Sequence, residues 1–264
     1  MPYPNPEYPA ARRWYAVEEL VEEAMAAADV VGLGRWASIN QRFQYLIQGI
    51  VQRRTKAAVA NFVHADDLSA FFAVLDKTDS AIGGSTALSV ITPHCNWKPH
   101  DLNVMAPQDS SGRWLAFFRH HGYQGQEICL GELGEYEHPR YPVLQGTVAH
   151  AVYLFQHDKI KVQGFTALRE SILTEFQNDI VLIISNSNSC MTPIIGAQTT
   201  SQMNAVTSSH IYCLYPSLTT QSIALRGYYA NPADKYSPMA LLSDRRDQLR
   251  VQQLTYHESS LDLN

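Results

Sequence analysis

The chain has 264 residues, of which 17% are charged and 45% hydrophobic, and its 20 Lys and Arg against 25 Asp and Glu give a formal net charge of -5. This length and composition are sufficient for a folded hydrophobic core, and they exclude disorder as the overall state. The pI of about 6.0 provides no general positive field, so we expect no general DNA binding.

No segment of the sequence predicts insertion into a membrane. The longest aliphatic run, residues 180–184, is far shorter than the roughly 20 residues that a spanning helix needs. Arg12 and Arg13 are followed by glutamates and not by an apolar segment, so no signal peptide is predicted. The 4 cysteines are widely spaced and favour reduced thiols. We therefore expect a cytoplasmic protein without a membrane partner.

Residues 1–64 are predicted to form a proline-rich arm and a helical extension. The prolines that precede residue 10 favour an extended arm. Apolar residues then recur at helical spacing over about 14–31, and Gly32 and Gly34 are predicted to end this helix. A second helix is predicted over about 39–63.

Residues 65–225 are predicted to form an α+β core, in which a mixed sheet is flanked by helices. Asp66 is predicted to cap a short helix over 68–75. Strands are expected over 81–82, 102–105, 148–155 and 160–162, and helices over 86–91, 113–121 and 167–176. Residues 180–225 lack Asp, Glu, Lys and Arg, which is typical of a buried strand pair with polar turns or of a neutral ligand surface. Residues 226–264 are predicted to form a C-terminal helix and tail.

The most specific local motif is a Gly-Gly-Ser turn between the first short strand and its helix. Gly83 and Gly84 let the backbone approach a ligand closely, and the helix that begins beside Ser85 presents free N–H groups and its positive dipole end to a phosphate. Asp101 and Asn103 are two residues apart on a predicted strand, so their side chains point to one face. Oxygen ligands in such an arrangement can hold a divalent metal ion.

The order of these two motifs, Gly-Gly-Ser-Thr-Ala-Leu and then His-Asp-Leu-Asn-Val, resembles the nucleotidyltransferase-like superfamily. The resemblance is to toxin-type nucleotidyltransferases and related uncharacterised fungal proteins, and it covers about Asp66 to Leu218. It implies a nucleotidyltransferase-like fold in which Gly83, Gly84 and Ser85 cradle a nucleoside triphosphate. It also implies Mg²⁺ bound by acidic residues and in-line transfer to an acceptor, for which a protein is one candidate.

The chain departs from the family pattern at two of the three acidic positions. Asp101 matches the first acid, and the resemblance assigns catalysis and metal binding to it. Asn103 replaces the second acid and offers a metal ion an amide oxygen without a charge. The third acid is expected on a later strand, for which residues 159–162 are the best match, and this places Lys161 where it would pair with Asp101 or a phosphate. The sequence therefore favours nucleotide or phosphate binding over active transfer.

Other interpretations of the same residues stay open. The domain could be a non-enzymatic protein-interaction module on the same scaffold, with Gly-Gly-Ser as an ordinary turn. Ser85 could instead be the nucleophile of a serine hydrolase, with His210 or His257 as its base. A third interpretation is a metal site built from residues that lack the usual ligand spacing, namely His94, Cys95, His100 and Asp101, with His120 and His121 as further candidates.

Overall fold

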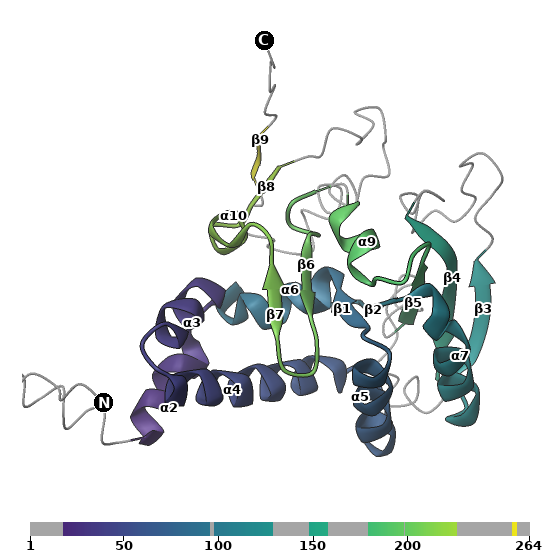
Figure 1. The fold of residues 1–264 in the computed structure, drawn as a ribbon, viewed down its shortest axis with the longest axis horizontal. Helices are drawn as coiled ribbons and strands as arrows, with labels where there is room; N and C mark the ends of the chain where they lie inside the picture. The colour runs from purple at the N-terminus through teal and green to yellow at the C-terminus, as the bar shows by residue number, and fades with distance from the viewer. Residues whose placement is uncertain are drawn as a thin grey trace, which may run out of the picture.

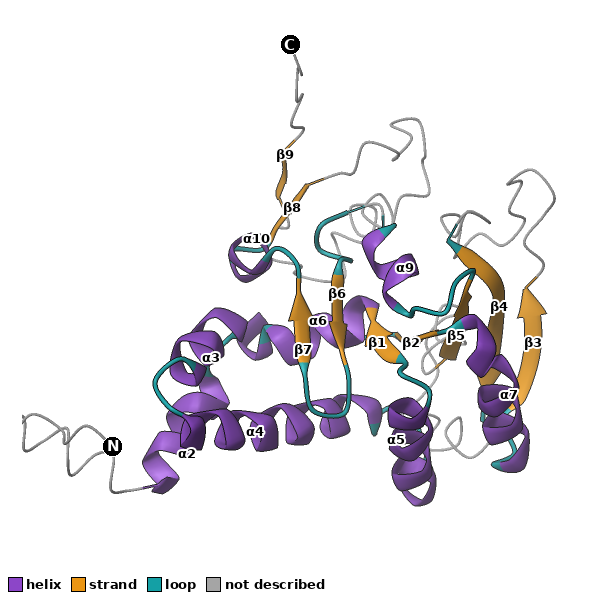
Figure 2. Ribbon diagram, in the orientation of Figure 1, coloured by secondary structure: helices purple, strands orange, loops and turns teal. Residues whose placement is uncertain are grey.

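A seven-stranded mixed sheet with the order β3-β4-β5-β2-β1-β6-β7 organises the chain (Figures 1 and 2). The computed structural model describes residues 18–95, 98–128, 148–157, 179–197, 199–225 and 255–257. Helices lie on both faces of the sheet and beside it. The predicted α+β class, with a mixed sheet flanked by helices, is confirmed at this level.

The strands pair antiparallel everywhere in the large sheet except at its centre. There β2 (Asp101–Ala106) pairs antiparallel with β1 (Ala81–Gly83) and parallel with β5 (Asp179–Ser185). The other strands of this sheet are β3 (Gln124–Ile128), β4 (Ala149–Gln156), β6 (Asn204–Val206) and β7 (Ile211–Cys213). A separate pair of parallel strands joins β8 (Ile223–Leu225) to β9 (Thr255–His257).

The main hydrophobic core lies between one face of the sheet and four helices. These helices are the end of α4 (Gln41–Val59), α5 (Leu68–Lys77), α6 (Gly84–Ile91) and α7 (Ser111–His120). Because side chains alternate along a strand, Leu102 and Val104 enter this core while Met105 enters a smaller core on the opposite face. The short helix α9 (Met191–Ile195) packs against that opposite face through Ile194.

The N-terminal helices differ from the prediction in where the first one ends. Gly32 and Gly34 do not end a helix; they lie inside α3 (Val30–Ala37), which follows α2 (Glu18–Ala27) after a short break. The break is explained by Asp29, whose carboxylate accepts a hydrogen bond from the Gly32 N–H at 2.8 Å and caps α3. The predicted second helix is confirmed as α4, which begins at Gln41 and ends at Val59.

The predicted cap of the next helix is also corrected. A short 3₁₀ turn, η1 (Ala65–Asp67), precedes α5, and the imidazole of His64 accepts a hydrogen bond from the Asp66 N–H at 3.4 Å. The capping side chain is therefore His64, and Asp66 contributes the backbone N–H that is capped.

The remaining predicted elements are confirmed wherever the structure describes them. The strands expected over 81–82, 102–105 and 148–155 are β1, β2 and β4, and the helices over 86–91 and 113–121 are α6 and α7. The strand over 160–162, with Lys161, the helix over 167–176 and the C-terminal helix lie outside the described residues. In the uncharged span, β5 is buried along its whole length, as expected of a buried strand. Within the described ranges, no helix combines the length and the apolar character needed to cross a membrane.

Arg54 on α4 joins the N-terminal helices to the core. One guanidinium nitrogen donates to the carbonyl oxygens of Met25, Ala26 and Ala28 at 3.3, 2.9 and 2.6 Å, where α2 ends. The other terminal nitrogen donates to the Val90 carbonyl of α6 at 3.2 Å. Burial lowers the pKa of Arg54, and the negative charge of Asp29 opposes this shift. The guanidinium thus satisfies carbonyl groups at two helix ends at once.

We expect Arg54→Met to lower the free energy of unfolding by about 2–4 kcal/mol, because part-buried carbonyl groups lose a charged donor. Chemical denaturation measures this change. Arg53→Met is the matched control, since Arg53 is exposed and its contact with Glu22 is a 3.6 Å surface ion pair, so its loss should cost no more than about 1 kcal/mol. Equal effects of the two substitutions would contradict the role of Arg54.

Candidate functional site

The pairing of β2 with its two neighbours brings the predicted site residues together. Asp101 is in register with Asp179 of β5, and Asn103 is in register with Gly83 of β1. Residues in register on adjacent strands lie about 4.8 Å apart and point to the same face of a sheet. Asp101, Asn103 and Asp179 therefore share one face at the edge where β2 and β5 begin.

Helix α6 begins beside these residues, as the Gly-Gly-Ser motif predicts. Gly83 ends β1, and Gly84 turns the chain into the helix with a φ of 66°, in the left-handed region that favours glycine. The Ser85 hydroxyl donates to Asp101 Oδ1 at 3.3 Å, and the Thr86 hydroxyl donates to the Asp101 carbonyl oxygen at 2.8 Å. The structure thus joins the start of the helix directly to the first acidic residue.

Gly84 is required by space as well as by its backbone conformation. A Cβ atom at this position would lie 2.7 Å from Asn103 Nδ2, well inside van der Waals contact. Glycine at this position therefore leaves the space beside the first turn of α6 that the Asn103 amide occupies.

We expect Gly84→Ala to destabilise the protein by about 1–3 kcal/mol, because it combines a strained φ with a steric clash. Gly112→Ala in α7 is the control, since nothing lies within 4 Å of its added Cβ and alanine favours a helix. The midpoints of thermal unfolding of the two variants provide the comparison. A Gly84→Ala protein as stable as the wild type would contradict this account.

Asp179 is a candidate site residue that the sequence did not reveal. The strand next to β2 in space is β5, and its first residue occupies the position in register with Asp101. Asp179 is only 2% exposed, and the Gln156 side-chain amide donates to its Oδ1 at 2.8 Å. A signal for it was present in the sequence: Asp179 directly precedes the longest aliphatic run, just as Asp101 precedes an apolar strand.

The donor set at this edge fits a hard divalent cation better than a transition metal. Asp101 and Asp179 supply carboxylate oxygens, and the Asn103 amide can supply a neutral oxygen, all from adjacent strand positions. In the described part of the chain, no group of three or more His, Cys, Asp and Glu is placed to hold a metal ion. The alternative set around His94, Cys95 and His100 thus gains no support.

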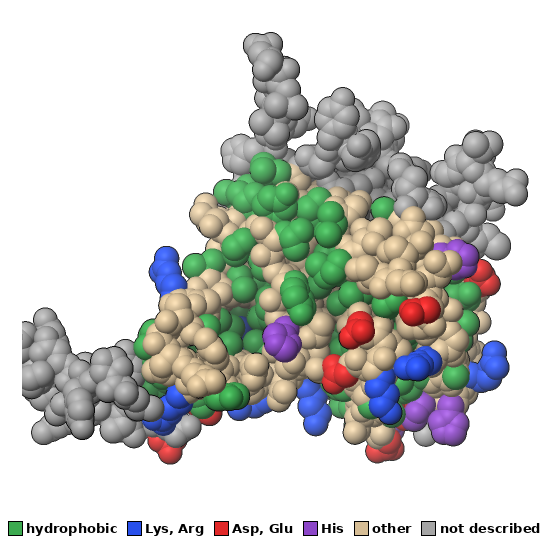
Figure 3. All heavy atoms as spheres, viewed as in Figure 1, with side chains coloured by type: hydrophobic (Ala, Val, Ile, Leu, Met, Phe, Trp, Pro, Cys, Tyr) green, Lys and Arg blue, Asp and Glu red, His purple; other side chains and the backbone are tan. Residues whose placement is uncertain are grey.

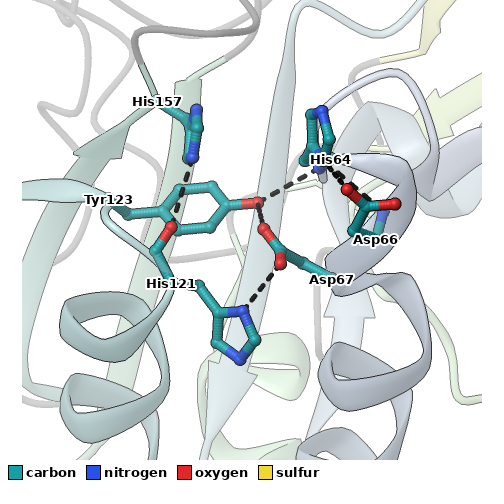
Figure 4. Close-up of polar contacts among 6 residues, drawn as sticks. All are labelled: His64, Asp66, Asp67, His121, Tyr123 and His157. Carbon is teal, nitrogen blue, oxygen red and sulfur yellow. Dashed lines mark hydrogen bonds and ion pairs between the residues drawn. The ribbon is translucent and has the colours of Figure 1, made fainter.

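A second polar cluster lies at the same edge of the sheet, on the face that α5 and α7 cover (Figure 4). The Asp67 carboxylate lies 2.7 Å from His121 Nδ1 and accepts a hydrogen bond from the Tyr123 hydroxyl at 3.4 Å. The Tyr123 oxygen in turn accepts from the His64 N–H at 3.2 Å. The ring of His157 packs edge-on against Tyr123, with centroids 4.6 Å apart. This cluster links the loop before α5 to the start of β3 and the end of β4.

The environment of Tyr123 keeps its hydroxyl protonated. Burial is the largest cause that raises the pKa of Tyr123, to about 12, and the negative charge of Asp67 acts in the same direction. The hydrogen bond from the His64 N–H has the opposite effect. The hydroxyl therefore stays a donor to Asp67 well above neutral pH.

At neutral pH, Tyr123→Phe is expected to cost about 1–3 kcal/mol, because the His64 N–H and the Asp67 carboxylate lose a partner. The folded state holds the Tyr123 proton more tightly than the unfolded state, and the stability linked to this raised pKa is fully present below pH 10. It falls as the pH rises from about 10 to about 12, because the unfolded state has released the proton in this range and the folded state has not. Denaturation at several pH values should show the difference between wild type and variant shrinking over this range. A difference that does not change would contradict the assignment.

Ser85 has no arrangement typical of a hydrolase nucleophile among the described side chains. Its hydroxyl donates to a carboxylate, whereas His210 Nδ1 lies 2.9 Å from the Ser209 hydroxyl, on the turn between β6 and β7. The side chain of His257 lies outside the described residues. A serine nucleophile requires a base within hydrogen-bonding distance, so the hydrolase interpretation gains no support from these contacts.

No family model, curated protein or solved structure matches this chain.

Proposed function

We propose that this chain is a nucleotidyltransferase-like domain that binds a nucleoside triphosphate together with one divalent metal ion. One observation carries the proposal. Two carboxylates in register, Asp101 and Asp179, meet the N-terminus of a glycine-initiated helix whose Ser85 contacts the first of them. Phosphate and a divalent cation are the ligands that these two features suit.

Each part of the proposed site has a separate task. The backbone N–H groups at the start of α6 donate to phosphate oxygens, and the left-handed φ of Gly84 turns the chain into this helix beside the carboxylates. Asp101 and Asp179 hold the cation, and the Asn103 amide adds a neutral oxygen. When bound, Mg²⁺ neutralises phosphate charge and orients the triphosphate. In this arrangement Ser85 holds the Asp101 carboxylate beside the helix start.

The donor set favours binding over rapid transfer. Two-metal transfer relies on several carboxylates to offset the charge of two divalent ions. Here Asn103 contributes an oxygen without a charge, so two carboxylates suit one metal ion. We therefore assign nucleotide binding as the primary function and nucleotidyl transfer to an acceptor, including a protein, as a secondary possibility.

Thermal unfolding of the purified protein with ATP, GTP, CTP or UTP, each with and without Mg²⁺, tests the proposal. At 100 times its dissociation constant, the ligand should stabilise the protein by about 2.7 kcal/mol. We expect a shift that depends on Mg²⁺ for at least one nucleotide, and Asp101→Asn should remove most of it. Asp109→Asn, an exposed carboxylate in the 3₁₀ turn before α7, should leave it unchanged. The absence of any shift would contradict nucleotide binding.

A protein-interaction module is the second candidate, and one surface feature favours it. Tyr212, Leu214 and Tyr215 are 44%, 39% and 41% exposed at the edge strand β7 and just before α10 (Pro216–Thr220). Figure 3 shows apolar side chains gathered over this part of the molecule. An edge strand with exposed aromatic groups is a surface on which another chain can pair. An unfolding midpoint that no nucleotide changes would favour this second candidate.

A further inference from the structure

A buried carboxylate needs hydrogen-bond donors, and Asp179 receives one from Gln156. Asp179 is 2% exposed, so it has little access to water, and an unsatisfied charge at such a position is costly. The Gln156 Nε2 donates to Asp179 Oδ1 at 2.8 Å. An amide satisfies an oxygen without supplying a positive charge, which an arginine or lysine in its place would do. The contact therefore fixes the orientation of the carboxylate through a neutral donor.

Gln156 reaches Asp179 because of its register at the end of β4. Phe155 is paired with Ile180 in the antiparallel ladder, so the next position places Gln156 opposite Asp179. The amide thus crosses a single strand spacing, from β4 to β5, on the face that also carries Asp101.

The residue after Gln156 anchors the end of β4 to the opposite side of the sheet. His157 is 9% exposed, and its Nε2 lies 3.2 Å from the His121 carbonyl oxygen at the end of α7 (Figure 4). Its ring packs against Tyr123 and is stacked at 6.0 Å from the ring of His64. Successive side chains of a strand point to opposite faces. The Gln156 side chain therefore points to the carboxylates, and the His157 side chain points to the cluster around Tyr123.

We infer that Gln156 is a positioning residue, which orients Asp179 for metal binding and is itself held in place by the His157 anchor. This inference rests on the proposed function, since it gives Asp179 the role of a metal ligand. Residues that orient a metal ligand by hydrogen bonding typically change metal affinity by about 10–100-fold when they are removed. Gln156 belongs to this class by its contact with Asp179 and by its register at the end of β4.

Titration of the full chain with MnCl₂ tests this inference, with free Mn²⁺ measured by electron paramagnetic resonance. Gln156→Leu removes the donor and should weaken Mn²⁺ binding by about 10-fold or more. Gln156→Asn keeps an amide but shortens its reach, so it should weaken binding similarly and provides a second variant if the leucine protein does not fold. Gln126→Leu on β3, an exposed glutamine paired opposite Leu154 and not Asp179, is the matched control and should bind as the wild type does.

The two substitutions at positions 156 and 179 should not be additive. Asp179→Asn should itself weaken binding, with Asp101 still present, and Gln156→Leu added to it should cause no further loss beyond about twofold. This result is expected only if Gln156 acts through Asp179, since general damage to the fold would weaken binding in both backgrounds.

The outcomes separate the inference from the function on which it rests. A wild-type protein that binds no Mn²⁺ at millimolar concentration overturns both. Wild-type affinity in both Gln156→Leu and Gln156→Asn overturns the positioning role and leaves the proposed function intact. Equal losses from Gln156→Leu in the wild-type and Asp179→Asn backgrounds also overturn it, because the residue would then act by another route.

Discussion

The position of β2 between an antiparallel and a parallel neighbour is the constraint on which the rest of the structure depends. The antiparallel pairing with β1 places Gly83 opposite Asn103, at the point where the chain turns into α6. The parallel pairing with β5 places Asp179 opposite Asp101. Moving β5 by one residue would turn the Asp179 side chain to the other face of the sheet and separate the carboxylates, and moving β1 would take Gly83 away from Asn103. The candidate site is therefore a consequence of register.

Helix α6 is held at both ends by contacts that belong to different parts of the chain. At its N-terminus, the hydroxyls of Ser85 and Thr86 bond to Asp101, which ties the helix to the start of β2. At its C-terminus, the Val90 carbonyl accepts from Arg54, which also bonds to the carbonyl groups at the end of α2. The N-terminal helices consequently support α6 from its C-terminal end, whereas the proposed phosphate site lies at its N-terminus beside β1 (Figure 1).

The two faces of one sheet edge carry polar groups of different kinds. On one face, the Gln156 amide donates to the buried Asp179 carboxylate; on the other, the Tyr123 hydroxyl donates to Asp67 beside the core of α5 and α7. Gln156 and His157 connect the two faces because they are neighbours on one strand. A polar group buried without partners would be costly, and the linked contacts avoid this cost on both faces.

The local pattern of the sequence determined much of the fold on its own. The α+β class, the strand–Gly-Gly-Ser–helix unit and the shared face of Asp101 and Asn103 follow from spacing and glycine content, since alternation and turn chemistry act over only a few residues. The ends of helices were harder, as Gly32 and Gly34 show, because the side chain of Asp29 and tertiary packing outweighed the weak preference of glycine against helix.

Only the tertiary structure decided which distant segments meet. The sequence suggested the strand expected over 159–162 for the third acidic position, and those residues lie outside the described ranges. The parallel neighbour of β2 in the structure is β5, which begins at Asp179, 78 positions after Asp101. Periodicity carries no information about strand order, because pairing between segments so far apart depends on how the whole sheet assembles. For the same reason the sequence did not predict the contact of Gln156 with Asp179, the cluster around Tyr123 or the four carbonyl oxygens that accept from Arg54. Each of these is a contact between two elements and is not encoded in the local pattern of either one.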